Sequence, residues 1–372
     1  MANNNDKKVL NVPALRFPEF TGEWKSVHLE DVAEFQKKRI SSDLLNNNNY
    51  ISTENILQNF EGIQYSSSIP TNTNVIEYQK GDILLSNIRP YLKKVWFSDR
   101  KGGCSADVFV LRGDKCDQHF LYYVIASDKF INYVMSGVKG VKMPRGDKNQ
   151  MKKYAFSIPT NTEQRKIAKF LSMLDERIKL QNKIIEKLET LIKGIRNNIM
   201  SKIKGDCITL QDIADIYQPQ TIASTDLTED GYLVYGANGI IGKYHSFNHE
   251  KEQICITCRG NTCGTVNFTE PKSWITGNAM VINTDNYAKN VNKRYLFHYL
   301  SSINFNSIIS GSGQPQIVRQ PLAKLKLILP VLIIQNRIAE CLDAMFAKMK
   351  NEQSFLQILQ IQKSCLLSQM FI

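Results

Sequence analysis

The sequence lacks the motifs of several enzyme classes. Residues 236–243 resemble a phosphate-binding loop but carry one residue too many, and Tyr244 follows where serine or threonine is needed. Residues 311–316 lack the third glycine of a dinucleotide-binding loop, and no Asn-Pro-Pro-aromatic tetrapeptide of amino-methyltransferases occurs. The Glu-x-Lys at 270–272 has no convincing acidic partner upstream for a nuclease site. We therefore expect no catalytic residues in the chain itself.

The sequence also has few cysteines and no long apolar run. Its 8 cysteines among 372 residues show no framework spacing, and no stretch approaches the roughly 18 apolar residues that span a bilayer. The Asn-rich, charged start at 1–8 does not read as a signal peptide. We expect a folded protein of the reducing cytoplasm, without a membrane segment and long enough for two domains or more. An excess of 47 Lys and Arg over 35 Asp and Glu favours a polyanionic partner.

The chain repeats itself once. A shift of 171 residues superposes proline, glutamine and apolar positions in the two halves. The matches include Pro144 with Pro315, Pro159 with Pro330, Gln164 with Gln335, and Leu171 with Leu342. Nearby segments match at shifts of 175 and 181. We interpret the chain as two diverged copies of one unit.

Each copy contains a predicted hairpin of two short strands. The apolar runs at 83–86 and 95–97 form the first hairpin, and those at 254–257 and 266–268 form the second. Basic and amide side chains occupy the intervening loops. A basic stretch near 137–153 of copy one, which includes Lys139, corresponds to a Gln- and Arg-bearing stretch at 311–324 of copy two.

Histidines and cysteines of the second copy form a candidate zinc motif. His-x3-His followed by Cys-x2-Cys supplies the ligand types that zinc prefers, at His245, His249, Cys255, Cys258 and Cys263. The positions matching Cys255 and Cys258 in copy one are Leu84 and Asn87. Small apolar or turn roles therefore explain these cysteines, and we expect no metal.

A coiled-coil seam closes each copy. Apolar residues recur at steps of 3 and 4, with a polar residue at the fourth place, Gln181 or Glu352. The first seam contains Leu171, Leu174, Ile178, Ile185, Leu188 and Ile192, and the second contains Leu342, Met345, Met349, Leu356, Leu359 and Leu366. Two seams of equal length in one chain predict that the helices pair with each other.

If the two helices pair side by side, they must run antiparallel and hold the two domains at opposite ends. A helix of about 40 residues is roughly 60 Å long, which corresponds to something like 15 base pairs of B-DNA. Such a coil would act as a ruler, that is, a stiff spacer that fixes the distance between two domains. Each domain would read a different DNA sequence. A helical hairpin that only dimerises the chain or docks a partner is the alternative.

The predicted DNA contacts are the basic and amide residues of the hairpin loops and of the stretches that follow. Lys suits phosphates, whereas Arg, Gln and Asn suit base edges. The candidates are Arg89, Lys93, Lys94, Lys142, Arg145, Lys148, Arg259, Asn261, Gln314, Gln316 and Arg319.

Together these features resemble the DNA-specificity subunit of a bacterial type I restriction-modification system. Residues 12–20 with Trp24 resemble the entry to the first target-recognition domain of that family, and 235–244 resemble its Gly-rich turn. Residues 159–177, with Glu163–Ala168, resemble the start of its helical spacer.

The resemblance implies an α+β fold with two pseudo-repeated target-recognition domains separated by a long antiparallel two-helix coil. The expected division is a lead at 1–19, domains at 20–160 and 204–331, and spacer helices at 161–203 and 332–372. It further implies a non-catalytic reader of a split, asymmetric site in double-stranded DNA. Two modification subunits would methylate adenine and restriction subunits would translocate and cleave DNA, with S-adenosylmethionine, ATP and Mg²⁺ bound by those partners.

Three competing functions remain at this point. A stand-alone DNA-binding regulator that dimerises through its coils would bind a site without partners. An enzyme with its own nuclease or methyltransferase activity would be active as the isolated chain. A structural coiled-coil scaffold would have no salt-dependent affinity for DNA.

Overall fold

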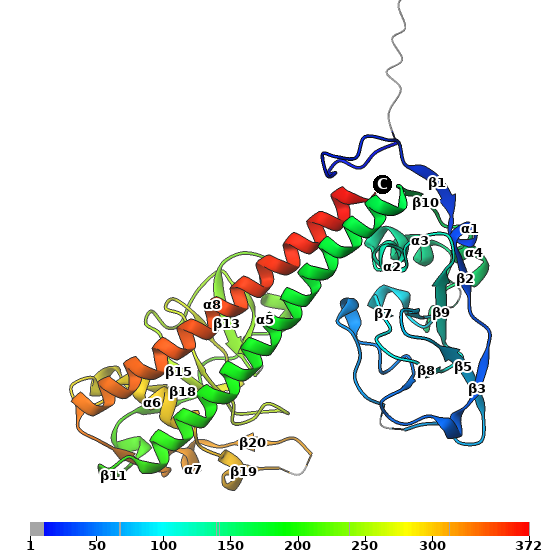
Figure 1. Ribbon diagram of the computed structural model, residues 1–372. Coiled ribbons are helices and arrows are strands. Elements are labelled where there is room, and N and C mark those ends of the chain that lie inside the picture. Colours follow the sequence, from blue (N-terminus) through cyan, green and yellow to red (C-terminus); the bar gives the residue numbers. More distant parts are fainter. Residues whose placement is uncertain are drawn as a thin grey trace, which may run out of the picture. The chain divides into compact units, whose positions relative to one another are not determined.

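The computed structural model describes residues 11–66, 68–138, 140, 142–237, 239–311 and 313–371 (Figure 1). Of the sequence predictions, those on the first ten residues, Lys139, Asn238 and Ser312 lie outside this range. The chain divides into two compact units. Unit 1 comprises the described residues up to Leu180 and those from Leu356 onward, and unit 2 comprises Gln181–Phe355.

The centre of unit 1 is a four-stranded antiparallel sheet. Its inner strand β6, Ile-Leu-Leu-Ser, is fully buried because the sheet is covered on both faces. Leu85 packs into a core with the helices, and Leu84 packs into a second core on the other face. The strand order is β2 (Ala33–Phe35), β9 (Val108–Gly113), β6 (Ile83–Ser86), β7 (Val95–Phe97).

A second sheet, which the sequence analysis did not predict, completes unit 1. Gly102 and Gly103 allow close packing there, since a Cβ at Gly102 would lie 2.0 Å from the Asn49 carbonyl oxygen. Its strand order is β3 (Arg39–Ser41), β5 (Asn74–Tyr78), β8 (Gly102–Cys104), β4 (Tyr50–Ile51).

Short helices flank the central sheet of unit 1. The side chains of Asp117 and Ser127 accept backbone N–H bonds and cap the first turns of α2 and α3. These helices are α1 (Leu29–Val32), α2 (Gln118–Ile125), α3 (Asp128–Ser136) and α4 (Lys148–Lys152). The antiparallel pair β1 (Lys25–His28) and β10 (Ala155–Ile158) joins the two ends of this region.

Unit 2 has a central sheet of the same order. Ile254 and Ile256 face one core and Cys255 faces another, which repeats the alternation of β6. The order is β12 (Asp215–Tyr217), β18 (Ala279–Asn283), β15 (Ile254–Thr257), β16 (Val266–Phe268). The two predicted hairpins are therefore confirmed, as β6–β7 and β15–β16.

The remaining elements of unit 2 surround this sheet. Three strands form a sheet of order β14-β13-β17, and two antiparallel pairs, β11–β21 and β19–β20, stand apart from it. The strands are β11 (Asp206–Thr209), β13 (Tyr232–Gly236), β14 (Gly239–Tyr244), β17 (Trp274–Ile275), β19 (Ile309–Ser310), β20 (Gln316–Ile317) and β21 (Lys326–Leu329). The helices are α6 (Lys293–Leu300) and α7 (Arg319–Ala323).

Gln164 and Gln335 make the same hydrogen bonds in the two units. The side-chain oxygen of Gln164 accepts the N–H of Asp117 at 2.8 Å, and its amide donates to the Pro159 carbonyl at 2.9 Å. Gln335 accepts the N–H of Asn292 at 2.8 Å and donates to the Pro330 carbonyl at 2.8 Å. Each glutamine thus ties the start of a long helix to the cap of a domain helix.

The two long helices run antiparallel within each unit. They are α5 (Asn161–Lys202) and α8 (Leu332–Met370). In unit 1, Lys363 pairs with Asp175 at 2.6 Å, and in unit 2 the Gln181 amide bonds to Glu352. All predicted seam residues are buried or half-buried. Among the described residues, no helix is both long and apolar enough to cross a membrane.

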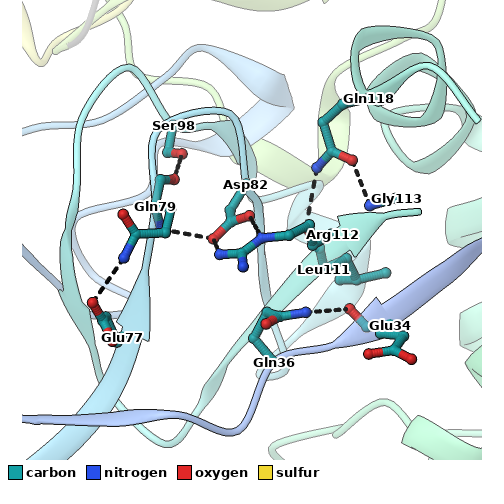
Figure 2. A network of polar contacts seen from close by, with 10 residues as sticks. All are labelled: Glu34, Gln36, Glu77, Gln79, Asp82, Ser98, Leu111, Arg112, Gly113 and Gln118. Carbon is teal, nitrogen blue, oxygen red and sulfur yellow. Dashed lines mark hydrogen bonds and ion pairs between the residues drawn. The ribbon is translucent and has the colours of Figure 1, made fainter.

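An ion pair between Asp82 and Arg112 fixes the central sheet of unit 1 to the turn before β6 (Figure 2). Arg112 on β9 donates two bonds of 2.7 Å to the buried Asp82 carboxylate, which also accepts the Gln79 N–H at 2.7 Å. The matching position in unit 2 is Gln253, which donates to Asp285 at 2.9 Å.

The predicted fold class, α+β with two repeated regions and long paired helices, is confirmed.

Candidate nucleic-acid interface

The turn between β6 and β7 holds two basic residues in an unusual backbone conformation. Arg89 has φ 51° and Lys93 has φ 53°, on either side of the short 3₁₀ helix Pro90–Leu92. This left-handed region costs a residue with a Cβ about 1–3 kcal/mol. Such strain persists where the surrounding structure imposes it, and it is concentrated at functional sites.

Backbone contacts bring this turn against the basic stretch of copy one. The Arg89 N–H donates to the Pro144 carbonyl at 2.8 Å, and the Gly146 N–H donates to Asn87 at 3.1 Å. Ile88 and Arg145 consequently face each other in an isolated β-bridge. Residues that are more than fifty positions apart in the sequence therefore form one surface.

Unit 2 contains the same bridge at positions 171 residues later. The Gly260 N–H donates to the Pro315 carbonyl at 3.0 Å, and the Ile317 N–H donates to Cys258 at 3.0 Å. Arg259 and Gln316 form the β-bridge. Both units thus join a hairpin turn to a following loop through one shared backbone arrangement, but they present different side chains on it.

Glycine takes the strained positions of the turn in unit 2. Gly260, at φ 84°, corresponds to Arg89, and Gly264, at φ 91°, corresponds to Lys93. Glycine adopts this conformation without steric cost. Unit 1 therefore carries two cations at positions where the fold alone favours glycine.

Most of the predicted DNA contacts are exposed and available. Arg89, Arg259 and Arg319 have exposed side chains that form no hydrogen bond or ion pair within the described part of the chain. The same holds for Lys142, Asn261, Gln314 and Gln316.

The other predicted contacts already have partners within unit 1. Four basic residues are involved, each bound by a different group. Lys93 pairs with Asp128 at 2.6 Å, Arg145 pairs with Asp107 at 2.8 Å, Lys94 donates to the Thr53 carbonyl at 2.7 Å, and the Lys148 ammonium lies 4.7 Å from the centre of the Phe35 ring. These interactions hold the loops in place, so we rank the four below the seven free residues as DNA contacts.

Two lysines at this surface have lowered pKa values, chiefly because they are partly buried. Burial lowers the pKa of Lys94, the Glu54 carboxylate opposes this shift, and the nearby Arg89 adds to it. Burial also lowers the pKa of Lys148, with additional effects of Lys37 and Lys152. An anion bound here would relieve this repulsion.

The candidate zinc residues do not converge. The His249 ring nitrogens lie 2.9 Å from the Tyr217 hydroxyl and 2.6 Å from the Asn248 side-chain oxygen. The Cys258 thiol contacts the Gln218 amide at 3.2 Å. No group of three or more His, Cys, Asp or Glu residues in the described ranges could hold a metal ion.

Sequence reasoning missed the residues that support the two loops. Asp107, which pairs with Arg145, corresponds to Asn278, whose carbonyl accepts the Cys258 N–H at 2.9 Å. Both positions follow from the shift of 171, so the repeat contained the signal. Their role depends on contacts between distant segments and was not legible from the residues alone.

The chain matches a known family over most of its length. The family model for the type I restriction modification DNA specificity domain matches residues 21–190 and 206–360. Among characterised sequences, the type I restriction enzyme EcoprrI specificity subunit of Escherichia coli is 28% identical over 169 residues, which is 44% of this chain and 41% of that protein. A putative type I specificity subunit of Haemophilus influenzae is 28% identical over 116 residues, or 30% of this chain and 29% of that protein. The chain thus spans less than half the length of these relatives.

Solved structures share the fold. A type I restriction-modification S subunit from M. genitalium superposes with a TM-score of 0.66 at 17% identity, over 97% of this chain and 99% of that one. A chain from a study of complex assembly and conformational transition of the type I R-M system gives a TM-score of 0.56 at 18% identity, over 92% and 96% of the two chains.

Proposed function

We propose, from the premise that this chain belongs to the family of type I restriction-modification DNA specificity subunits, that it reads a bipartite, asymmetric site in double-stranded DNA. Each unit would read one half-site through its hairpin turn and the adjoining loop. The chain would direct adenine methylation and DNA cleavage that partner subunits carry out.

The observation that carries this proposal is the shared loop bridge with different side chains. The bridge joins Ile88 to Arg145 in unit 1, where Arg89 directly follows Ile88, and it joins Arg259 to Gln316 in unit 2. Arginine and glutamine make bidentate contacts to guanine and adenine edges, respectively. One backbone frame with two sets of such side chains supports two readers of different sequence.

The strained turn supports a role for Arg89 in recognition. A position where glycine would fit without strain keeps an exposed arginine that has no partner in the described residues. Replacing Arg89 or Arg259 by alanine should weaken binding by about 1–3 kcal/mol if the lost contact is to a base. Each substitution should relax specificity in one half-site only.

We further propose that the paired helices set the spacing between the half-sites. Helix α5 is continuous over 42 residues and belongs to unit 1 before residue 181 and to unit 2 after it. A continuous helix without proline in its interior is a stiff connection.

Two modification subunits would bind the long helices. Positions beside the seam expose large apolar side chains, which supports a protein partner. They include Met173 (61% exposed) and Leu180 (62%) in unit 1, and Leu191 (54%) in unit 2. Asp175, by contrast, faces the domain of its own unit, because its carboxylate accepts a hydrogen bond from the Tyr123 hydroxyl at 2.8 Å.

S-adenosylmethionine, ATP and Mg²⁺ would belong to the modification and restriction subunits, and the complex would act in the cytoplasm. The alternative is a stand-alone regulator. A specificity subunit needs the modification subunits for tight DNA binding, whereas a regulator binds its site without a partner.

DNA binding with and without the modification subunit tests the proposal. The complex should bind a bipartite duplex at least 10³-fold more tightly than random duplex, whereas the isolated chain should discriminate far less. Tight, specific binding by the isolated chain would favour the regulator. Equal affinity of the complex for both duplexes would contradict the proposal.

A further inference from the structure

A concave site in unit 2 lies between α5 and the turn of the second reader. Its volume is about 520 Å³. Lys193, Arg196 and Asn197 of α5 line one side, and the turn 263–265 and the loop 301–306 line the other. No acidic residue contributes to this lining.

The charge of Arg196 is uncompensated. Its side chain is half-buried, and its Nε atom is shielded from solvent without a hydrogen-bond partner in the described structure. Burial lowers the pKa of Arg196, because no carboxylate offsets the loss of solvent. On α8, the Asp343 carboxylate is already bound by Arg294 and His298. Lys193 adds an exposed ammonium that has no partner in the same ranges.

Amide groups complete a lining suited to an oxyanion. The side chains of Asn197 and Asn306 are exposed at the site and form no hydrogen bond with the described residues. The Ser301 and Ser302 hydroxyls instead donate to backbone carbonyls, at 2.7 and 2.6 Å. Guanidinium, ammonium and amide donors around one cavity are the groups that bind phosphate oxygens.

The cavity adjoins the residues that we propose to read bases. Gly264, on its wall, belongs to the same turn as Arg259 and Asn261. Ile309, also on the wall, pairs with Ile317, which follows Gln316 on β20. An anion in the cavity would therefore sit beside the base-reading side chains of unit 2.

The equivalent place in unit 1 has a different charge arrangement. Ser364 and Leu367 of α8 stand where α5 carries Lys193 and Arg196. Lys93 stands at the Gly264 position and is paired with Asp128, and Lys129, which matches Asn304, donates to the Phe371 carbonyl at 2.9 Å. The cations of α5 are thus specific to unit 2.

These cations lie beside a part of the second copy that has little net positive charge. Residues 204–328 hold 11 Lys and Arg against 10 Asp and Glu, whereas the part of α5 that belongs to unit 2, residues 181–202, holds 5 against 2. The globular part of unit 2 therefore has little excess charge of its own to hold a polyanion. Helix α5 supplies it at the edge of the reader.

We propose that this cavity binds a backbone phosphate of the DNA whose bases unit 2 reads, with Arg196 and Lys193 as its ligands. The inference rests on the proposed function. A phosphate contact fixes the register of the duplex against the reader and carries no base preference of its own. An acidic side chain of a partner protein is the competing occupant.

Salt-dependent binding by the complex with the modification subunit tests this site. The variants are Lys193→Gln, Arg196→Gln and Asn306→Asp, the last of which adds a negative charge without removing the half-buried arginine. Lys183→Gln, an exposed substitution on α5 away from the cavity, is the matched control. Affinities are measured on site-containing and random duplexes between 50 and 200 mM salt.

Each cavity variant should weaken binding to both duplexes by the same factor and lower the slope of log K against log salt by about 1. The methylated sequence and the control should not change. Unchanged affinity and slope in all three variants would overturn the site, and so would weaker association with the modification subunit at an unchanged slope of log K against log salt, which indicates a partner's carboxylate. Absence of site-specific binding by the unmodified complex would instead refute the proposed function.

Discussion

Gln181 on α5 donates its side-chain amide to the carboxylate of Glu352 and, at 3.1 Å, to the carbonyl of the same residue on α8, and the two residues are 171 positions apart. Equivalent positions of the repeat therefore contact each other directly. This relation is what local two-fold symmetry between antiparallel helices requires, and it fixes their register.

We predict that this polar pair costs stability and provides register. The double substitution Gln181→Leu with Glu352→Leu should raise the midpoint of thermal unfolding, because it replaces the polar pair by apolar packing at the fourth seam position of both helices. Gln181→Leu alone should lower it, since the carboxylate loses its amide donor. Thermal unfolding of the three variants measures this coupling. A double variant less stable than the Gln181→Leu single variant would contradict the interpretation.

We predict that Arg89→Gly separates stability from recognition. Glycine removes the strain of the left-handed backbone, offset in part by its greater freedom in the unfolded chain, for a net gain of about 1 kcal/mol. DNA recognition in the first half-site should weaken. Denaturant unfolding and binding measurements on the same protein check both effects. Lower stability together with unchanged recognition would remove Arg89 from the interface.

We predict that His298 makes unit 2 sensitive to mild acid. Burial lowers the pKa of His298 despite its 2.7 Å bond to Asp343, and Arg294 and Arg196 oppose its protonation further. The unfolded chain therefore takes up a proton below a pH of about 6.5 that the folded state resists, so the free energy of unfolding falls as the pH drops. Asp343 does not contribute in this range, because its pKa lies below the usual carboxylate value.

His298→Gln removes this titration while keeping a group able to donate to Asp343. Its free energy of unfolding should change less between pH 7.5 and 5.5 than that of the natural chain. Urea unfolding at the two pH values gives the comparison. An identical pH dependence in both proteins would show that other groups cause it.

We predict that helix length sets the spacer of the recognised site. Inserting one heptad into both α5 and α8 keeps the seam in phase and lengthens each helix by about 10 Å, equivalent to roughly 3 base pairs. The half-sites should stay the same while their separation increases. Mapping methylated sites for the lengthened chain tests this, and an unchanged spacer would refute the ruler.

The repeat and the helix pattern could be predicted from the sequence, because the repeat follows from comparing the chain with itself and the seam is a local periodicity. The run at 254–257 predicted β15, and the seam from Leu171 to Ile192 predicted the buried face of α5. The sheet containing β4 and β8 was not predicted. Its strands are two to five residues long, and Tyr50 pairs with Gly103 across more than fifty residues.

The candidate site could be predicted only in part, because only some of its features are local in the sequence. Charge and loop position pointed to Arg89 and Arg259, whose side chains are exposed. Nothing local in the sequence shows that Lys93 is paired with Asp128. From the sequence, Arg196 of the cavity looks like any other charged residue of the predicted coil. Only the folded structure places the turn 263–265 beside it.

Single-molecule mapping of N6-methyladenine tests the central claim most directly. A methylation-free host would express this chain with its modification subunit, and each protein alone would serve as a control. We predict a split, asymmetric motif that is methylated only when both proteins are present. Absence of methylation by a stable complex, or methylation of one continuous motif, would contradict the account.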